Sequence, residues 1–398
     1  MPYVEREPPF IERDLAATLR ERLRHYPVAT VTGPRQSGKT TLCRTLLSDR
    51  PYVSLEGMDV RAYAREDPRG FLHEYRDGAV IDEVQRAPDL TSYLQEEVDR
   101  DPTPGRFVLT GSQHFGLSEA VSQSLAGRVG VLHLLPPGFN ELARFGGRTP
   151  ELLDCLWTGA YPRIHHRGIP PDVWLRDYFT TYIERDVRSL RNVTDLAAFS
   201  AFVRLAAGRT ATEVNLSALA GDAGIRHNTA RAWLSVLETS FLVIHVPAFR
   251  RNLRKRQIKA PKLHFLDSGL LCHLLGIRSP EELRHHPLRG QIFESWVVSE
   301  VFKTITHRGR EPRLGHYRAP RTEVDLVVDR GLRLILAEAK SGTTIVPRFL
   351  AGLRGIAASL EEAGQSVERR LVYGGDSRHR RNDTEVLPWN RMLEVDWG

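Results

Sequence analysis

The chain has 398 residues, enough for two or three domains, and its 41% hydrophobic and 26% charged residues are ordinary for a globular protein. No apolar run is long enough to span a membrane, and residues 1–13 lack the apolar core of a signal peptide, so we expect a cytoplasmic protein. The cysteines are too far apart for a metal motif or a disulfide framework: Cys43, Cys155 and Cys272. The net charge of +7 is compatible with an anionic partner, for which nucleic acid is the usual candidate.

The first 26 residues predict a helical lead-in, because apolar residues recur every four positions from Ile11 to Leu23. A P-loop domain of the AAA type is then expected over residues 27–145. Residues 28–32 are apolar and β-branched and predict a buried strand, while a helix is expected from Thr41. Between them, Gly33–Thr40 matches the phosphate-loop pattern G-x-x-x-x-G-K-[ST] at every fixed position, in the strand-loop-helix context that this motif requires.

Each part of this loop has a chemical reason. Gly33 and Gly38 let successive backbone N–H groups converge into a nest for an anion, and the helix N-terminus adds partial positive charge. Lys39 is expected to reach the β- and γ-phosphates, and the Thr40 hydroxyl to ligate Mg²⁺. The predicted nucleotide-binding residues are Gly33, Pro34, Arg35, Gln36, Ser37, Gly38, Lys39, Thr40 and Thr41.

A second NTPase motif follows at residues 78–83, where an apolar strand ends in Asp82 and Glu83. Asp82 is expected to hold Mg²⁺ directly or through water, and Glu83 to orient or deprotonate the attacking water. A strand ending in two acids is common, but downstream of a phosphate loop it indicates an ATPase. Another strand, 51–55, is expected between the two motifs.

Two polar positions later in the domain have alternative interpretations. A strand over residues 106–112 ends at Ser112, which either contacts the γ-phosphate or the water, as Thr110 also could, or forms a simple turn. Arg128 is either an arginine finger, from this chain or a neighbouring copy, or a surface residue. Residues 129–135 predict the last core strand, and strands alternating with helices predict a parallel α/β sheet.

Four of these stretches resemble a bacterial and archaeal family of AAA-type ATPases, single-chain proteins whose ATPase domain precedes a C-terminal domain of unknown function. They are Gly33–Thr40, Val80–Glu83, Leu109–Ser112 and Ala126–Arg128, and the resemblance covers nearly the whole chain. It implies ATP binding and hydrolysis, with the catalytic and ligand roles on Lys39, Thr40, Asp82, Glu83 and Ser112. The resemblance supplies no cellular task.

The middle region, residues 146–265, predicts helices and a winged helix. Residues 216–220 and 227–238 have the apolar spacing of a helix-turn-helix, and residues 241–246 predict a strand. A basic run without acids follows: Arg250, Arg251, Arg254, Lys255, Arg256, Lys259 and Lys262. A basic wing beside a recognition helix fits contact with the DNA backbone, and the alternative is a packing or regulatory module.

The C-terminal region, residues 266–398, carries a second constellation. Asp325 lies on one predicted strand, and Glu338 and Lys340 end the next, which resembles the arrangement of the PD-(D/E)xK nucleases. Asp325 and Glu338 are expected to hold Mg²⁺, Lys340 to position water, and Glu294 on the preceding helix to complete the site. The alternative is a nuclease-like fold that only binds.

The expected fold is therefore multidomain α/β: a parallel P-loop sheet, a helical and winged-helix middle, and a nuclease-like C-terminal domain. Three functions remain open. The first is an ATP-hydrolysing protein that couples nucleotide state to DNA handling, the second an ATP-gated nuclease dependent on Mg²⁺, and the third a nucleotide-switched DNA-binding regulator without catalysis. ATP and Mg²⁺ are the expected cofactors. The sequence leaves open DNA as a partner and assembly into an oligomer, and predicts no membrane partner.

Overall fold

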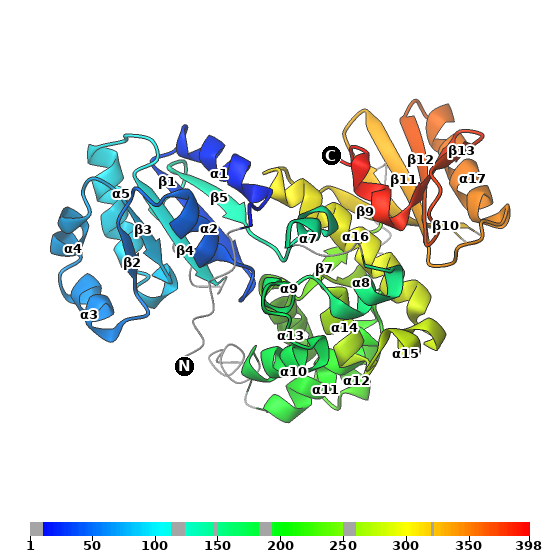
Figure 1. Cartoon of the computed structure of the whole chain (residues 1–398), viewed down its shortest axis with the longest axis horizontal. Coiled ribbons are helices and arrows are strands. Elements are labelled where there is room, and N and C mark those ends of the chain that lie inside the picture. Colours follow the sequence, from blue (N-terminus) through cyan, green and yellow to red (C-terminus); the bar gives the residue numbers. More distant parts are fainter. Residues whose placement is uncertain are drawn as a thin grey trace, which may run out of the picture. The chain divides into compact units, whose positions relative to one another are not determined.

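The computed structural model describes residues 11–112, 124–145, 150–182, 193, 195–249, 260–319 and 322–398 (Figure 1). The chain forms two compact units. The first comprises Met1–Gly147, Tyr161–Arg167 and Thr306–Gly309, and the second comprises Arg148–Ala160, Gly168–Ile305 and Arg310–Gly398. The boundary expected at residue 265 does not separate compact units, because the regions on both of its sides belong to the second unit. Across the described ranges, no helix combines the length and apolar character needed to cross a membrane.

The first unit is built on a five-stranded sheet in the order β2-β3-β4-β1-β5. Every pairing in this sheet is parallel, which confirms the predicted α/β architecture. Its strands are β1 (Val28–Gly33), β2 (Tyr52–Ser54), β3 (Ala79–Asp82), β4 (Phe107–Ser112) and β5 (Val129–His133).

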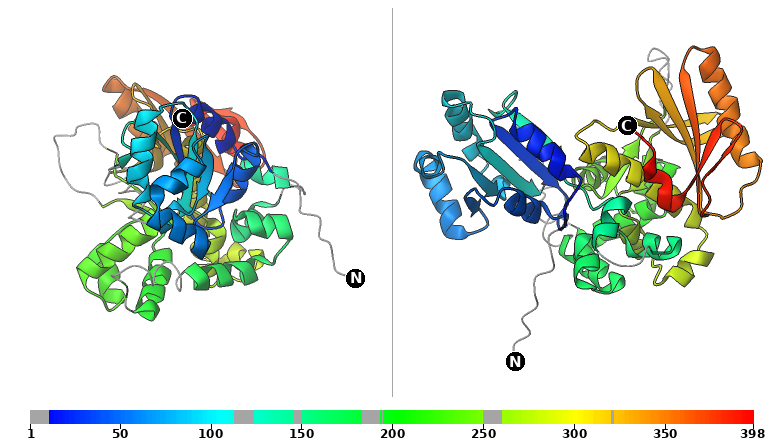
Figure 2. Two further views of the ribbon diagram at one scale, coloured as in Figure 1. Left: turned by 90° about the vertical axis from the view of Figure 1, so that its left-hand side faces the viewer. Right: turned by 45° about the horizontal axis from the view of Figure 1, so that its top comes forward.

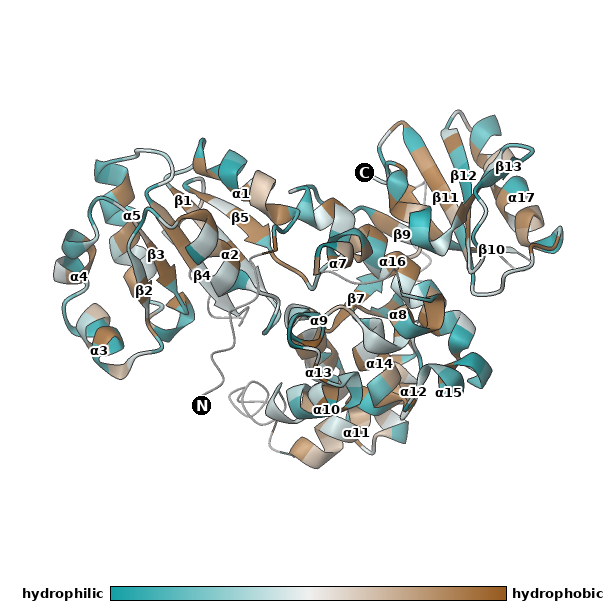
Figure 3. Ribbon diagram, in the orientation of Figure 1, coloured by the Kyte–Doolittle hydropathy of each residue, from teal (hydrophilic) through white to brown (hydrophobic). Residues whose placement is uncertain are grey.

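Helices cover both faces of this sheet, because its central strands are apolar on both sides (Figure 3). On one face, Leu15 and Leu19 of α1 and Leu42 of α2 pack against Val31. On the other face, the buried side chains of α4 and α5 pack against the opposite residues of the same strands. The elements of this unit around the sheet are α1 (Leu15–Leu23), α2 (Lys39–Leu46), α3 (Met58–Glu66), α4 (Pro68–Glu74), η1 (Val84–Arg86), α5 (Leu90–Arg100), α7 (Phe139–Leu142), η2 (Ala143–Phe145) and α9 (Pro162–Arg167).

The second unit begins with helices and a small antiparallel sheet in the order β6-β8-β7. The two helices expected from the apolar spacing are present as α12 and α13. Asn215 caps α12 by accepting a hydrogen bond from the Ala218 N–H, and Trp233 and Leu237 of α13 are buried. The elements are α8 (Leu152–Thr158), α10 (Pro171–Tyr182), α11 (Leu196–Ala207), β6 (Thr212–Glu213), α12 (Leu216–Asp222), α13 (His227–Thr239), β7 (Val243–Val246), β8 (Lys262–Phe265), α14 (Ser268–Leu274) and α15 (Pro280–His285).

The rest of this unit is a six-stranded mixed sheet in the order β13-β14-β12-β11-β10-β9. Strand β10 pairs antiparallel with β9 and β11, whereas β11 and β12 are parallel. Leu353, Ile356 and Leu360 of α17 pack on this sheet, and Figure 2 shows α17 lying along it. The elements are α16 (Arg289–His307), β9 (Leu314–Ala319), β10 (Thr322–Asp329), β11 (Arg333–Lys340), α17 (Arg348–Glu362), β12 (Ser366–Tyr373), β13 (His379–Arg381), β14 (Thr384–Pro388) and η4 (Trp389–Glu394).

Candidate functional site

The phosphate loop joins the end of β1 to the start of α2, as the motif requires. Gly33 has a φ of 148°, and a Cβ there would lie 2.1 Å from the Leu134 carbonyl oxygen, so a side chain does not fit. Gly38 has a φ of 95° and forms the N-cap of α2. The two motif glycines are thus required by backbone conformation and close approach. The other predicted loop residues, Pro34, Arg35, Gln36 and Ser37, lie between them, and Thr41 is in the first turn of α2.

The Lys39 side chain folds back onto the loop. Its Nζ donates hydrogen bonds to the carbonyl oxygens of Gly33 at 3.0 Å and Pro34 at 2.7 Å. Burial lowers the pKa of Lys39 to about 8, although the nearby carboxylates of Glu83 and Asp82 oppose that shift. The ammonium is therefore held inside the loop, among the groups that would surround a phosphate.

Asp82 at the end of β3 is the centre of a hydrogen-bond network. Its Oδ2 accepts bonds from the Thr40 hydroxyl at 2.9 Å and the Tyr52 hydroxyl at 2.6 Å, and its Oδ1 accepts one from the Thr110 hydroxyl. Burial raises the pKa of the Tyr52 hydroxyl, and Asp82 raises it further. The role of Tyr52 was not predicted. The signal available in the sequence was its place on the expected second strand, which the structure pairs with β3.

Glu83 follows Asp82 and has a left-handed backbone, with a φ of 56°. Its Oε2 accepts a hydrogen bond from the Gln85 side-chain amide. The same amide donates to the Ser112 hydroxyl at 3.2 Å, so Gln85 connects the ends of β3 and β4. The structure thus brings the predicted Glu83 and Ser112 to one edge of the sheet, through a residue that the sequence analysis did not single out.

Arg128 lies at the opposite edge of the sheet. It precedes β5, and its carbonyl accepts a hydrogen bond from the N–H of Val28, where β1 begins. The phosphate loop begins at Gly33, five residues beyond Val28 along β1, which is about 17 Å at roughly 3.3 Å per residue. The Arg128 guanidinium instead forms a bidentate ion pair with Asp99. In this structure Arg128 therefore lies away from the phosphate loop of its own chain, and a finger supplied to a neighbouring copy stays a prediction.

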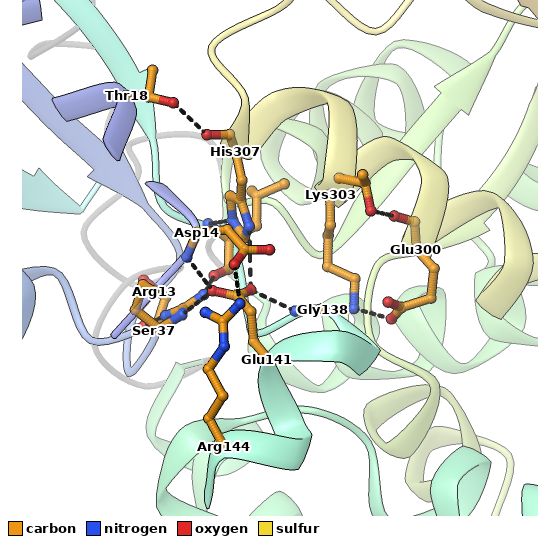
Figure 4. Close-up of polar contacts among 12 residues, drawn as sticks. Arg13, Asp14, Thr18, Ser37, Gly138, Glu141, Arg144, Glu300, Lys303 and His307 are labelled. Carbon is orange, nitrogen blue, oxygen red and sulfur yellow. Dashed lines mark hydrogen bonds and ion pairs between the residues drawn. The ribbon is translucent and has the colours of Figure 1, made fainter. Parts of the chain in front are cut away.

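A buried ion pair between Arg13 and Glu141 supports the phosphate loop (Figure 4). The Arg13 guanidinium donates to the Ser37 carbonyl at 2.7 Å and to Glu141 Oε1 at 2.8 Å. The Gly138 N–H donates to Glu141 Oε2 at 2.8 Å, and the His307 ring lies 3.3 Å from the same oxygen. Burial by itself raises the pKa of the Glu141 carboxyl, but Arg13 and His307 outweigh it and hold that pKa well below its usual range.

In the second unit, the four predicted C-terminal residues, Glu294, Asp325, Glu338 and Lys340, line one cavity of about 520 Å³. The Lys340 Nζ lies 2.6 Å from Glu338 Oε1 and 3.4 Å from Asp325 Oδ2. Asp325 Oδ2 also accepts a hydrogen bond from the Ala339 N–H at 2.9 Å. Glu338 Oε2 is buried without a hydrogen-bond partner. The predicted residues are thus neighbours in space.

Lys262, which was expected to belong to the basic run that contacts DNA, instead lines the same cavity. The residue is 2% exposed, and its Nζ lies 2.8 Å from Glu294 Oε1 and 2.7 Å from Glu323 Oε1. It is therefore engaged with carboxylates and cannot contact DNA. The remaining residues predicted for DNA contact lie outside the described ranges: Arg250, Arg251, Arg254, Lys255, Arg256 and Lys259.

Two acids of this cavity have raised pKa values. Burial, and then the charge of Asp325, raises the pKa of Glu294 to about 8 and that of Glu338 to about 7. Within the ranges that the structure describes, no group of three or more His, Cys, Asp or Glu side chains is placed to hold a metal ion. Lysine ammonium groups and bound protons therefore balance the negative charge of these carboxylates.

Comparisons with protein families match three parts of the chain. Residues 25–143 match an AAA domain, while residues 149–281 and 289–392 match two domains of unknown function, DUF8612 and DUF4143. The chain is 31% identical over 394 residues to the uncharacterized proteins Rv2008c of Mycobacterium tuberculosis and Mb2031c of Mycobacterium bovis, covering 96% of this chain and 84% of each relative. A Walker-type ATPase of Pyrococcus abyssi has 16% identity and a TM-score of 0.46, over 69% of this chain and 98% of the other.

Proposed function

This chain belongs to the protein family of Rv2008c and Mb2031c, and we propose that it is an ATPase that depends on Mg²⁺ and couples its nucleotide state to DNA handling. The observation that carries the ATPase proposal is the meeting of Lys39, Thr40 and Asp82 at one edge of a parallel sheet that matches an AAA domain. Chemistry of this kind needs a cationic cradle for phosphate and oxygen ligands for a metal at that edge.

The residues present fit a magnesium ion at the phosphate loop. The Thr40 hydroxyl and the Asp82 carboxylate are 2.9 Å apart. Neighbouring ligands of an octahedral ion with bonds of roughly 2.1 Å lie about 3 Å apart, so Thr40 and Asp82 are the residues that would hold it. Mg²⁺, when bound, neutralises charge that develops on the β- and γ-phosphates. Lys39 binds the same phosphates. Glu83, the residue after Asp82, orients the attacking water.

The first test is ATP binding and turnover by the purified full chain carrying Lys39→Ala. The substitution removes a charge-assisted contact to phosphate, and we expect nucleotide binding or turnover to be lost. The matched control is Arg24→Ala, which removes one exposed cation outside the site and is expected to leave both measurements unchanged. Wild-type affinity and turnover in Lys39→Ala would exclude the phosphate loop as the nucleotide site.

DNA handling is supported by the order of elements in the second unit. A helix (α11), a short strand (β6), two helices (α12, α13) and a hairpin (β7, β8) follow one another, with a three-stranded sheet in the order β6-β8-β7. This is the order of a winged helix, and residues 250–259, which lie between β7 and β8 in the sequence, are rich in Arg and Lys. A positively charged wing next to a helix-turn-helix suits contact with DNA phosphates.

Neutralising Arg254, Lys255 and Arg256 together tests this part of the proposal. We expect weaker DNA binding and a salt dependence that flattens by up to roughly three phosphate contacts, because each contact releases counterions. The measurement is DNA affinity as a function of salt concentration. The control for net charge replaces three arginines of the first unit, the exposed Arg24 and Arg65 and the half-buried Arg61. An unchanged salt slope would make the basic run a solvated surface or a packing element.

The alternative of a nuclease dependent on Mg²⁺ has less support. Glu338 Oε2 is an orphaned buried oxygen, as a metal ligand awaiting its ion would be. However, one oxygen each of Glu294, Glu323 and Glu338 and both oxygens of Asp325 face Lys262, Lys340 or the Ala339 N–H. The side chains as arranged do not fit a divalent cation, and no cleavage step is assigned to them.

A further inference from the structure

We infer that Lys262 is a built-in cation of the C-terminal cavity: its ammonium group takes the position of a divalent ion between Glu294 and Asp325, so that the cavity binds such an ion only when Lys262 is removed. This inference concerns the second unit and is independent of the proposed ATPase activity. The nuclease-like side chains of the cavity do not fit a metal ion as they are arranged, and Lys262 accounts for this.

The position of the Lys262 ammonium is the first argument. Its Nζ contacts Glu294 and Glu323 at 2.8 and 2.7 Å and lies 3.9 Å from Asp325 Oδ1. On the other side of the same carboxylate, Lys340 lies 3.4 Å from Oδ2. Both oxygens of Asp325 therefore face an ammonium group, and the pair Glu294 and Asp325 is bridged by a cation as metal ligands would be.

The backbone that carries Lys262 is the second argument. Lys262 opens β8, the central strand of the small sheet, and is paired with Glu213 of β6 on one side and Val246 of β7 on the other. Pairing on both sides fixes the direction of its side chain, which is 3% exposed. The cation is thus supplied by β8, a strand that is held on both sides and lies far from β10 and β11 in the sequence.

The charge balance of the cavity is the third argument. Five acids line it, Glu213, Glu294, Glu323, Asp325 and Glu338, against the three cations Lys262, Arg318 and Lys340. Fully ionised, the cavity has two more negative than positive charges, and the raised pKa values of Glu294 and Glu338 are consistent with that excess. Removing Lys262 raises the excess to three charges around the cavity, which favours uptake of a divalent cation.

The test measures Mn²⁺ binding by electron paramagnetic resonance, without nucleotide, to the full chain and to Lys262→Met. Met keeps an unbranched apolar stem, is one heavy atom shorter than Lys and lacks the charge. We expect Lys262→Met to bind one Mn²⁺ at least roughly tenfold more tightly than the wild type, since the competing positive charge at the position of the ion has been lost. We also expect Mn²⁺ to raise the melting temperature of this variant more than that of the wild type.

Two further variants make the outcome unambiguous. Lys262→Met with Asp325→Asn is expected to lose the added Mn²⁺ binding, which assigns the ion to this cavity instead of Thr40 and Asp82. Lys262→Met with Glu294→Gln replaces both partners of one buried pair, so we expect it to fold even if the single variant does not, and its Mn²⁺ affinity is expected to fall back toward the wild type. Equal Mn²⁺ affinity of wild type and Lys262→Met, or wild-type binding that is lost in Asp325→Asn, would overturn the inference. ATP turnover, measured in parallel, tests the proposed function separately.

Discussion

With Glu83→Gln, we expect ATP to remain bound while turnover falls by about 10²- to 10⁴-fold, the usual contribution of a positioned general base. The amide has the shape of the carboxylate but cannot accept a proton from water. Its oxygen can still accept the hydrogen bond that Gln85 donates to Glu83, so the local structure is preserved. Lys39, Thr40 and Asp82 are unaltered, which is why nucleotide affinity is expected to persist.

The measurements are steady-state ATP turnover and nucleotide affinity, made side by side. Glu66→Gln, at an exposed acid near the end of α3, removes the same charge away from the site and is expected to leave both unchanged. Turnover at the wild-type rate in Glu83→Gln would assign the water to another residue. A wild-type chain that binds ATP without any turnover would instead favour the nucleotide-switched regulator.

Replacing Glu141 by Ala is expected to destabilise the first unit by about 3–5 kcal/mol, the range for removing one partner of a buried ion pair. The carboxylate side chain is fully buried, and its loss leaves the Arg13 guanidinium in a dry environment without a counter-charge. The N–H groups of Asp14 and Gly138 also lose their acceptor. Because Arg13 also binds the Ser37 carbonyl, we expect the phosphate loop to loosen with it.

Hydrogen exchange followed by mass spectrometry is the suitable measurement. All six tryptophans lie between Trp157 and Trp397, in segments of the second unit, so their fluorescence does not report on the first. We expect faster exchange in peptides from α1 and β5, with peptides from β10–β12 unchanged as an internal control. Glu12→Ala, which breaks an exposed ion pair with Arg20, is the matched variant and is expected to have little effect. Unchanged exchange in Glu141→Ala would show that solvent replaces the lost carboxylate.

The parts of the nucleotide site that the sequence predicted are those encoded over short distances. The glycines, Lys39 and Thr40 occupy eight consecutive residues, and their roles follow from backbone conformation and from the strand and helix on either side. Asp82 and Glu83 lie elsewhere in the sequence, but the carboxyl ends of parallel strands meet at one edge of a sheet, so their place could also be inferred. The same rule would have excluded Arg128 from this site, because it precedes its strand.

The class of the first unit, its strands and its phosphate loop could be predicted, because local patterns of apolar residues and glycines specify them. Which charges are buried together could not be predicted, because it depends on contacts between distant segments. Arg13 and Glu141 are 128 positions apart. In the sequence, Lys262 ends a basic run. In the structure, it faces carboxylates of α16 and β10. Whether a lysine lies in water or in a cavity depends on pairing between strands that are distant in the sequence. The burial that gives such a lysine its role therefore cannot be recognised from its neighbours in the sequence.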